Sequence, residues 1–319
     1  MDAATADRPL LVFGGSGSPR LTRAICGHLG VPVGLGEVIR FSEGTLFVRI
    51  GQNVRGRDVY LVQSTVFPAN DNFMEMLFWI DAFKRASAAS VTVLIPYFSY
   101  AKGDKKDEPR VSIRARVCAD ALEAAGADRI VAVDLHSPQL QGFFRVPVDD
   151  LQARPALCDA IVADGLTEPV VVSPDEGFVK RARMFADRLG ASLAIGHKRR
   201  RAHDERAEVV ELIGDVEGRS CVVVDDFVIS GGTLIEIAAT LKARGAARVV
   251  AAVTHGVFSR DAGDLLQGSP IERLYVTDTI ENHPAPLSPK TRVVSVAPLL
   301  AEAIRRIHGR ESISVLFRD

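Results

Sequence analysis

Two adjacent carboxylates, Asp225 and Asp226, follow a run of valines and precede a Ser-Gly-Gly-Thr turn in the stretch VVVDDFVISGGTL (222–234). Carboxylates of this kind bind sugar hydroxyls or a hydrated metal ion. Gly231 and Gly232 let the backbone approach a ligand closely, and amides at a helix N-terminus suit a phosphate. The pattern is typical of a sugar-phosphate site. A lone acid pair followed by two glycines is also typical of an ordinary loop, so the rest of the chain has to decide.

The elements around this stretch indicate how the carboxylates are positioned. A buried parallel strand ending at the acid pair would deliver both side chains to the carboxyl edge of a sheet, where open α/β folds bind ligands. The apolar segment from Leu234 predicts a helix. The chain as a whole alternates short apolar strands with amphipathic helices in two successive series of similar size. This order predicts a doubly wound α/β fold with two related halves.

Composition sets the broad class of the protein. A length of 319 residues predicts roughly two domains, and a net charge of -1 gives no global attraction to nucleic acid or anionic membranes. The cysteines are widely spaced without a CxxC pair, which indicates reduced thiols in a cytoplasmic protein and argues against cysteine metal ligands. No run of about 18 uncharged apolar residues occurs, so we expect neither a membrane span nor export.

Several other segments carry candidate functional groups. Asp134-Leu135-His136 follows a predicted strand, which favours a metal or phosphate role for His136 over a structural one. The charged loop 97–110 follows another strand and so lies at the same kind of edge. The charged stretch 198–206 is long enough to form a mobile flap.

Two further segments are ambiguous from their residues alone. Phe41 stands beside a hairpin turn and suits either a core position or contact with a flat base; the sequence alone favours the core. Gly14, Gly15 and Gly17 could cradle a phosphate, but no GxxxxGK[ST] pattern is present, so a simple strand-to-helix turn is favoured.

The combination of ordered segments closely resembles the ribose-phosphate diphosphokinases, the phosphoribosyl pyrophosphate (PRPP) synthetases. The resemblance runs from about Leu10 to Phe317 and is carried by QSTVFPANDNFMEMLFWIDAFKRASA, DLHSPQLQGFF, SPDEGFVKRA, GHKRRR and VVVDDFVISGGTL. It implies an α/β fold of two type I phosphoribosyltransferase-like domains with mainly parallel sheets, related by internal duplication. The implied domains are 1–153 and 154–301, with the tail 302–319 packing on the first.

The resemblance also implies an activity. Such an enzyme transfers the diphosphoryl group of MgATP, or another nucleoside triphosphate, to O1 of ribose 5-phosphate and gives PRPP and AMP. The implied cofactor is Mg²⁺. The implied setting is cytoplasmic, in a homo-oligomer that is a hexamer or its dimer unit, with no nucleic-acid or membrane partner.

Residue roles carry over by motif. Lys198, Arg200 and His136 match catalytic positions, and His136 and Asp175 match metal positions. The ribose 5-phosphate positions are Asp225, Asp226, Ile229, Ser230, Gly231, Gly232 and Thr233. The nucleotide positions are Phe41, Glu43, Thr45, Lys102 and Gly103. A possible allosteric site for phosphate or ADP is formed by Arg55, Arg110, Ser312 and Ser314.

The chain departs from the family pattern at a few of these places. Glu43-Gly44-Thr45 stands where Asp-Gly-Glu is usual, and Lys102-Gly103 where Arg-Gln is common. Ile229 replaces an Asp, Phe178 a Gly and Asn53 a Ser. Three hypotheses therefore stay open: an active synthetase with an altered donor preference, a non-catalytic regulatory paralogue, and a phosphoribosyltransferase that consumes PRPP.

Overall fold

The computed structural model describes residues 10–166, 168–199 and 208–317, and the chain divides into two compact units. Of the described residues, unit 1 contains those up to Gln152, the short segment Thr279–Asn282 and those from Val296 to Phe317. Unit 2 contains Ala153–Asp278 and His283–Ser295. The first boundary lies one residue from the expected one. The C-terminal segment of unit 1 begins six residues earlier than expected. The assignment of Thr279–Asn282 to unit 1 was not expected from the sequence.

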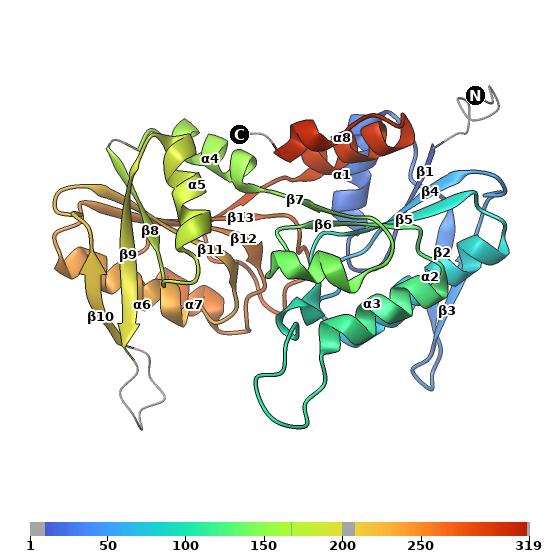
Figure 1. Ribbon diagram of the computed structural model, residues 1–319, viewed down its shortest axis with the longest axis horizontal. Helices are drawn as coiled ribbons and strands as arrows, with labels where there is room; N and C mark the ends of the chain where they lie inside the picture. Colours follow the sequence, from blue (N-terminus) through green and yellow to red (C-terminus); the bar gives the residue numbers. More distant parts are fainter. Residues whose placement is uncertain (1–9, 167, 200–207, 318–319) are drawn as a thin grey trace. The chain divides into compact units, whose positions relative to one another are not determined.

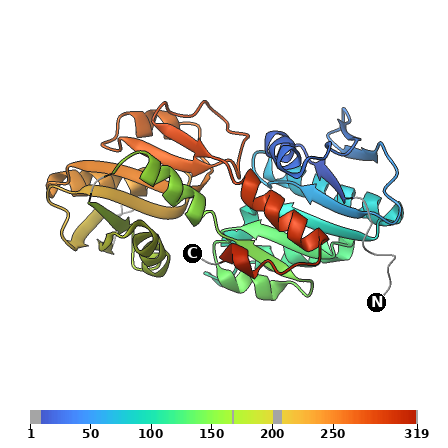
Figure 2. The same ribbon diagram turned by 90° about the horizontal axis from the view of Figure 1, so that it is seen from above.

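Unit 1 is built on a five-stranded parallel sheet covered on both faces. Its strands in spatial order are β1 (Leu10–Gly14), β4 (Asp58–Val62), β5 (Ser90–Ile95), β6 (Arg129–Val133) and β7 (Val148–Leu151). Helices α1 (Pro19–Leu29) and α8 (Ala297–His308) cover one face, and α2 (Ala69–Arg85) and α3 (Arg114–Ala125) cover the other (Figure 1). The view from above shows α8 lying beside α1 across the strands (Figure 2).

Smaller elements complete unit 1. The hairpin of β2 (Gly36–Arg40) and β3 (Leu46–Ile50) packs on α2. Short 3₁₀ segments occur at η2 (Ser99–Lys102), η3 (Pro138–Phe143) and η4 (Ser314–Phe317).

Unit 2 is built on a seven-stranded sheet that is parallel except at one edge. Its spatial order is β10 (Glu208–Ile213), β9 (Ser192–Arg199), β8 (Pro169–Ser173), β11 (Ser220–Val228), β12 (Arg248–Gly256), β13 (Arg273–Thr277) and β14 (Thr291–Val294). The antiparallel pair at that edge is β9 and β10. Helices α4 (Arg154–Ala163) and α5 (Val179–Leu189) lie on one face, and α6 (Gly232–Ala243) and α7 (Ala262–Gln267) lie on the other (Figure 1).

The sequence forms these sheets because the strands are rich in apolar residues. In β11 the residues Cys221–Val224 are all fully buried, as expected of a parallel strand with helices on both faces. Each unit has its own core. Trp79 stacks on Phe83 in unit 1, and Val223 of β11 belongs to one buried cluster with Leu241 of α6 in unit 2.

The two sheets share one strand order. In unit 2 the first strand, β8, lies between the second, β9, and the third, β11. In unit 1 the first strand, β1, pairs with β4 on one side, and Val12 makes a parallel bridge with Val33 at the place that corresponds to β9. The α/β class with mainly parallel sheets is confirmed, and the shared order supports related halves. In such sheets ligands bind where the order reverses, at the carboxyl ends of β1 and β4 and of β8 and β11.

Two local features differ from the sequence prediction. Strand β11 does not end at the acid pair but continues through it to Val228, because Asp225, Phe227 and Val228 still pair with β12. Helix α6 begins at Gly232, two residues before the expected start. The four cysteines are buried free thiols, and none of the described helices is long and apolar enough to span a bilayer.

Candidate active site

The acid pair lies at the point of unit 2 where the strand order reverses. Strand β8 pairs with β11 only as far as Val223, whereas β12 continues to pair with β11 at Asp225. The carboxyl end of β8 therefore stops short of the acid pair. Asp175 follows β8 by two residues, so three carboxylates gather at this edge.

Burial gives the acid pair unusual electrostatics. Asp226 is only 6% exposed, its backbone N–H donates to Asp225 Oδ1 at 2.9 Å, and the Phe227 N–H donates to Asp226 Oδ1 at 2.9 Å. Burial, followed by repulsion from Asp226 and a smaller effect of Asp175, raises the pKa of Asp225 well above the ordinary aspartate value. Acids held together in this way favour a bound cation or hydrogen-bond donors from a ligand.

Arg181 is a functional candidate that the sequence prediction missed. It lies in the first turn of α5, and its Nη1 is 4.0 Å from Asp226 Oδ2. Its guanidinium also lies 5.9 Å from the centre of the Phe178 ring. Its position in SPDEGFVKRA could have identified it as a site residue. The helix after β8 begins at the carboxyl edge of the sheet, so a residue in its first turn lies near that edge.

The loop between β8 and α5 holds Asp175 in a fixed orientation. The Phe178 N–H donates to Asp175 Oδ1 at 3.1 Å, and Ser173 Oγ donates to the Asp175 carbonyl at 2.7 Å. Phe178 has an ordinary backbone conformation, with φ -93° and ψ -4°. The side chain that replaces the family's glycine therefore introduces no backbone strain at Asp175.

The loop 229–233, here called the phosphate loop, joins β11 to α6 and presents backbone donors. Gly231 adopts φ +83°, a left-handed conformation that suits glycine, and its carbonyl accepts the first helical bond from Ile235. Among the described residues, the N–H groups of Ser230 and Gly231 donate no hydrogen bond, while Gly232 N–H reaches Ser230 Oγ at 3.4 Å. Free amides before a helix of this length bind phosphate.

The side chains of the phosphate loop leave this surface accessible. Ser230 is exposed, and Ile229, which replaces the family's Asp, is 42% exposed. The loop thus offers its backbone rather than an acidic side chain. That arrangement suits an anion.

One of the catalytic candidates, Lys198, lies at the β9–β10 edge of unit 2. Lys198 is the last residue but one of β9 and pairs with Val209 of β10. Arg200, together with most of the expected flap at 198–206, lies outside the described residues. Their roles stay predictions.

His136 belongs to unit 1, at the carboxyl end of β6. Asp134 has φ +45°, and the turn that it makes buries Leu135 while leaving His136 exposed. The Asp134 N–H donates to the Leu151 carbonyl at 2.8 Å, and the Leu135 N–H donates to Asp150 Oδ1 at 2.9 Å. A strained turn held by neighbouring groups is a common feature of functional sites.

The nucleotide candidates near Phe41 form a compact hairpin turn. Phe41 is 46% exposed and its ring lies 6.2 Å from that of Phe47, so the core position favoured by the residues alone is wrong. Thr45 Oγ1 donates to Glu43 Oε1 at 2.7 Å, and this hydrogen bond is the main cause of the lowered pKa of Glu43. The hydrogen bond favours the ionised form of Glu43, and one of its two carboxylate oxygens already accepts from Thr45 of the same turn.

The second nucleotide segment, Lys102 and Gly103, contains a close approach. A Cβ added at Gly103 would stand 2.7 Å from Nε and 2.9 Å from Cβ of Arg114. The Gly103 carbonyl also accepts from the Ala115 N–H at 3.1 Å. The arginine at the start of α3 thus fills the space where the family's Gln would begin its side chain, and it places a guanidinium beside Lys102-Gly103.

The glycine-rich turn after β1 is not a phosphate cradle. Its amides are already bonded to side chains of unit 1: Ser16 N–H donates to Glu75 at 2.8 Å, and Gly17 N–H donates to Gln63 at 2.9 Å. The first amides of α1 are bonded to Glu281, from Arg20 at 2.9 Å and from Leu21 at 3.1 Å. The simple turn favoured from the sequence is therefore correct.

The possible allosteric residues all belong to unit 1. Arg55 Nη1 donates to Ser87 Oγ at 3.2 Å, and Ser314 N–H donates to Ser312 Oγ at 3.2 Å. Arg110 has φ +66° in the charged loop. The allosteric role of these four residues stays a prediction.

No group of three or more His, Cys, Asp and Glu side chains within the described ranges is arranged so that it could hold a metal ion. Magnesium in phosphoryl-transfer sites is commonly held by one or two carboxylates together with substrate phosphates. Asp175, Asp225 and Asp226 supply oxygen donors of that type. The residues of unit 2 therefore fit Mg²⁺ bound together with a substrate.

Comparison with known proteins decides the family. Residues 10–126 match the family model described as the N-terminal domain of ribose phosphate pyrophosphokinase, and residues 204–318 match the phosphoribosyl synthetase-associated domain. The ribose-phosphate pyrophosphokinase of Chromobacterium violaceum is 47% identical over 97% of this chain and 95% of its own length. The chain belongs to the ribose-phosphate pyrophosphokinase family.

Other members of the family support this assignment. The enzyme of that name from Caldanaerobacter subterraneus is 47% identical over 97% of this chain and 98% of its own length. The crystal structure of phosphoribosylpyrophosphate synthetase from Mycobacterium smegmatis superposes with a TM-score of 0.88 at 39% identity, covering 95% of this chain and all of that one. The family resemblance and the fold are confirmed, whereas the roles of individual residues stay predictions.

Proposed function

We propose that this protein is an active ribose-phosphate diphosphokinase, which transfers the diphosphoryl group of MgATP to O1 of ribose 5-phosphate and releases AMP. The observation that carries the proposal is the edge of unit 2, where an acid pair with a buried Asp226 is followed, after two more residues of β11, by a loop with free backbone amides. These two features match the two ends of ribose 5-phosphate. The phosphate fits the N–H groups of Ser230 and Gly231, and the ribose hydroxyls fit Asp225 and Asp226.

The chemistry requires positioning and neutralisation of charge more than covalent catalysis. As O1 attacks the β-phosphorus, negative charge spreads over the phosphoryl oxygens and onto the departing AMP. Lys198 and Arg200 are the proposed cations for those oxygens, with the lysine as a point charge and the arginine as a planar, bidentate donor. His136 is a further proposed catalytic and metal-binding residue.

Mg²⁺ is the proposed cofactor. It would supply charge neutralisation and alignment of the phosphates. Asp175 is the proposed metal ligand in unit 2, next to the acid pair. The raised pKa of Asp225 accords with this, because a bound cation would offset the repulsion between the carboxylates.

The donor side is where this member of the family is expected to differ. Phe41 is exposed enough to stack on a base, but the Glu43–Thr45 hydrogen bond and the Lys102-Gly103 segment replace the usual groups. We propose that Arg114 supplies the guanidinium beside this segment. A changed preference among nucleoside triphosphates follows from these changes.

The proposed setting is the cytoplasm, in a homo-oligomer. Phosphate and ADP are the proposed regulators, and they would act through Arg55, Arg110, Ser312 and Ser314.

A donor screen tests the function. The purified protein is given ribose 5-phosphate, Mg²⁺ and each nucleoside triphosphate in turn, and PRPP and the nucleoside monophosphate are followed by phosphorus NMR. We expect PRPP and one equivalent of monophosphate with at least one donor. No PRPP with any donor would refute the proposal, provided that a family member of known activity produces it in the same assay.

A second candidate function is a non-catalytic regulatory paralogue that assembles with an active synthetase. The altered segments at Glu43–Thr45 and Lys102-Gly103 favour it, since both are expected to contact the nucleotide. Such a protein would make no PRPP alone but would change the rate of an active family member on mixing. Strong PRPP synthesis by the purified chain excludes it as the main role.

A further inference from the structure

Phe258 has a backbone conformation that is rare for an aromatic residue. Its φ is +50°, in the left-handed region. A bulky side chain there is strained and persists only where the surrounding structure enforces it, which happens most often at functional sites. Phe258 follows β12 by two residues, and β12 is the strand beside the acid pair on β11.

The strained turn holds the start of the phosphate loop. The N–H groups of Val257 and Phe258 both donate to the Val228 carbonyl, at 2.9 and 3.2 Å, and the Ser259 N–H donates to the Ile229 carbonyl at 2.7 Å. In a regular strand, successive carbonyls point to opposite edges. Here two successive carbonyls bond to the same neighbouring segment. The chain must therefore leave strand geometry at Ile229, where the phosphate loop begins.

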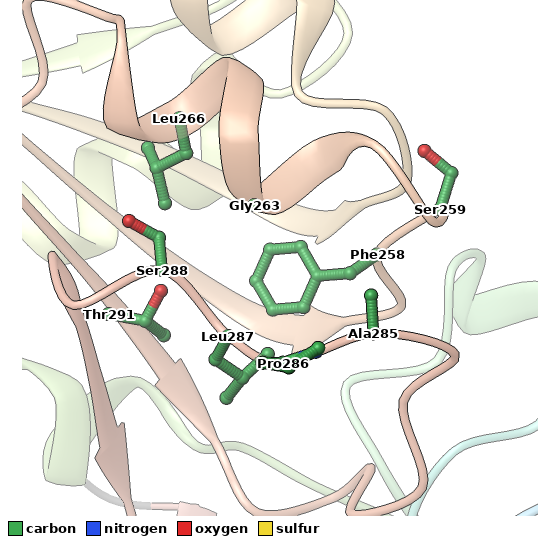
Figure 3. A pocket seen from close by; sticks show the side chains of 9 residues that line it. All are labelled: Phe258, Ser259, Gly263, Leu266, Ala285, Pro286, Leu287, Ser288 and Thr291. Carbon is green, nitrogen blue, oxygen red and sulfur yellow. The ribbon is translucent and has the colours of Figure 1, made fainter.

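The Phe258 side chain is wedged into the interior of unit 2. It is 6% exposed and points between α7 and the segment 285–288, while Ser259 lies at the outer edge (Figure 3). Phe258 also lines a second small cavity together with Gly231 and Leu234 at the start of α6. A Cβ at Gly256 would stand 2.5 Å from the ring, so only glycine at 256 leaves room for it.

The space beside the ring is too small for a substrate. The pocket drawn in Figure 3 has a volume of about 10 Å³, which is room for one water molecule. The ring therefore packs between elements and does not form a wall of a ligand site. Its effect on a ligand has to act through the backbone that it holds.

We propose that Phe258 is a positioning residue for the 5-phosphate of the acceptor. Its wedged ring fixes the turn Val257–Ser259, this turn holds the carbonyls of Val228 and Ile229, and the free amides of the phosphate loop are thereby aimed at the phosphate. The proposal rests on the proposed function of the phosphate loop. It goes beyond that function by assigning the shape of the loop to a residue outside it.

The test compares Phe258 variants with a matched control in the same unit. Phe258→Ala removes the ring, Phe258→Gly removes the ring and the strain together, and Phe258→Leu keeps apolar volume. Phe185→Ala is the control, because Phe185 is 5% exposed on the inner face of α5 and also loses a buried aromatic ring. Each variant is measured for its melting temperature, for kcat, and for KM of ribose 5-phosphate and MgATP separately.

We expect Phe258→Ala and Phe258→Gly to raise KM for ribose 5-phosphate about tenfold, with KM for MgATP within about twofold, because binding to the phosphate is lost and the donor is untouched. Phe258→Leu should recover most of the affinity. Phe185→Ala should lower the melting temperature without this selectivity. The proposal is overturned if Phe258→Ala changes both Michaelis constants equally or matches Phe185→Ala, or if Phe258→Gly retains the wild-type constant.

Failure of the proposed function gives a different result. In that case the wild-type protein makes no PRPP, and titration calorimetry with ribose 5-phosphate replaces kinetics for the same variants. Weaker binding of ribose 5-phosphate by Phe258→Ala than by Phe185→Ala then supports the positioning role, and equal binding refutes it. If Phe258→Ala does not fold, Phe258→Leu is compared with Phe185→Ala instead. We then expect a smaller rise in the dissociation constant for ribose 5-phosphate, and an unchanged constant would count against the proposal.

Discussion

The guanidinium of Arg114 lies over Gly103, with its Nε 2.7 Å from the position that a Cβ on Gly103 would take. A side chain at residue 103 and the observed arginine therefore compete for one space. We expect Arg114→Ala to raise KM for MgATP about fivefold, because a charged hydrogen bond to phosphate is lost, and to leave KM for ribose 5-phosphate unchanged. Steady-state kinetics with each substrate varied would show this split.

The competing space gives this prediction an internal control. Gly103→Gln alone should raise KM for MgATP, since Arg114 must move. Gly103→Gln combined with Arg114→Ala should bring KM for MgATP back toward the wild-type value. Additive effects of the two substitutions would contradict the shared space.

Arg181 should matter for the acceptor rather than the donor. Its Nη1 lies 4.0 Å from Asp226 Oδ2, and Asp226 is nearly buried. Arg181→Gln should raise KM for ribose 5-phosphate about tenfold, because a buried carboxylate loses a neighbouring cation. Arg181→Lys should recover part of the affinity if charge is what matters. Equal affinity in wild type and Arg181→Gln would remove Arg181 from the site.

Asp225 should make the ligand-free protein less stable as the pH rises. Because its pKa is raised in the folded chain, the unfolded chain ionises first, so stability is lost from the ordinary aspartate range near pH 3.8 upward until Asp225 itself ionises in the folded state. Asp225→Asn removes this loss. Its gain in unfolding free energy over wild type should be larger at pH 8 than at pH 5.

Denaturant unfolding at the two pH values measures this difference. Asp187→Asn, at an exposed position of α5 in the same unit, is the matched control and should show no such dependence. An equal gain for Asp225→Asn at both pH values would contradict a raised pKa.

Lys198 is expected to act on the transition state. Lys198→Ala should lower kcat by about a hundredfold or more and change KM for ribose 5-phosphate by less than about threefold, because its contact strengthens as charge develops on the phosphoryl oxygens. Steady-state kinetics of the purified variant measures both constants. A change confined to the Michaelis constant would show that the catalytic assignment is wrong.

Glu281 should stabilise unit 1 through backbone amides. Glu281→Ala leaves the N–H groups of Arg20 and Leu21 without their acceptor, which should cost about 2 kcal/mol. The ion pair with Arg20 adds little, since the Arg20 side chain is 67% exposed. Hydrogen exchange of the α1 amides measures the loss. Asp81→Ala, which removes an exposed i,i+4 pair on α2, should leave those amides protected.

Local patterns in the sequence predicted most of the fold and the centre of the candidate site. The sequence predicts the acid pair and the phosphate loop as site residues, because a strand, two acids, two glycines and a helix follow one another along the chain. Phe41 was harder: an aromatic residue beside a turn suits both the core and the surface, and only the packing of the hairpin shows it to be exposed.

The remaining features depend on contacts between distant residues. Glu281 is separated by 261 positions from Arg20, so no local pattern could show that it caps α1. Arg181 reaches Asp226 only once α5 lies against the sheet. Strand β11 continues through the acid pair because β12 is long enough to pair with it, whereas a pair of acids in a sequence is typical of the end of a strand.

Because of the Glu281 carboxylate, we expect the two units to respond differently to ribose 5-phosphate. In unit 1 the Glu281 carboxylate accepts hydrogen bonds from the first amides of α1, at the edge where the strand order reverses. At the corresponding edge of unit 2 the amides of the phosphate loop can bind an anion from solution. Ribose 5-phosphate should therefore protect the amides of β11 and α6 from exchange and leave those of α1 unchanged. In unit 1 a side chain of the protein therefore occupies the helix N-terminus that corresponds to the one proposed to bind phosphate in unit 2.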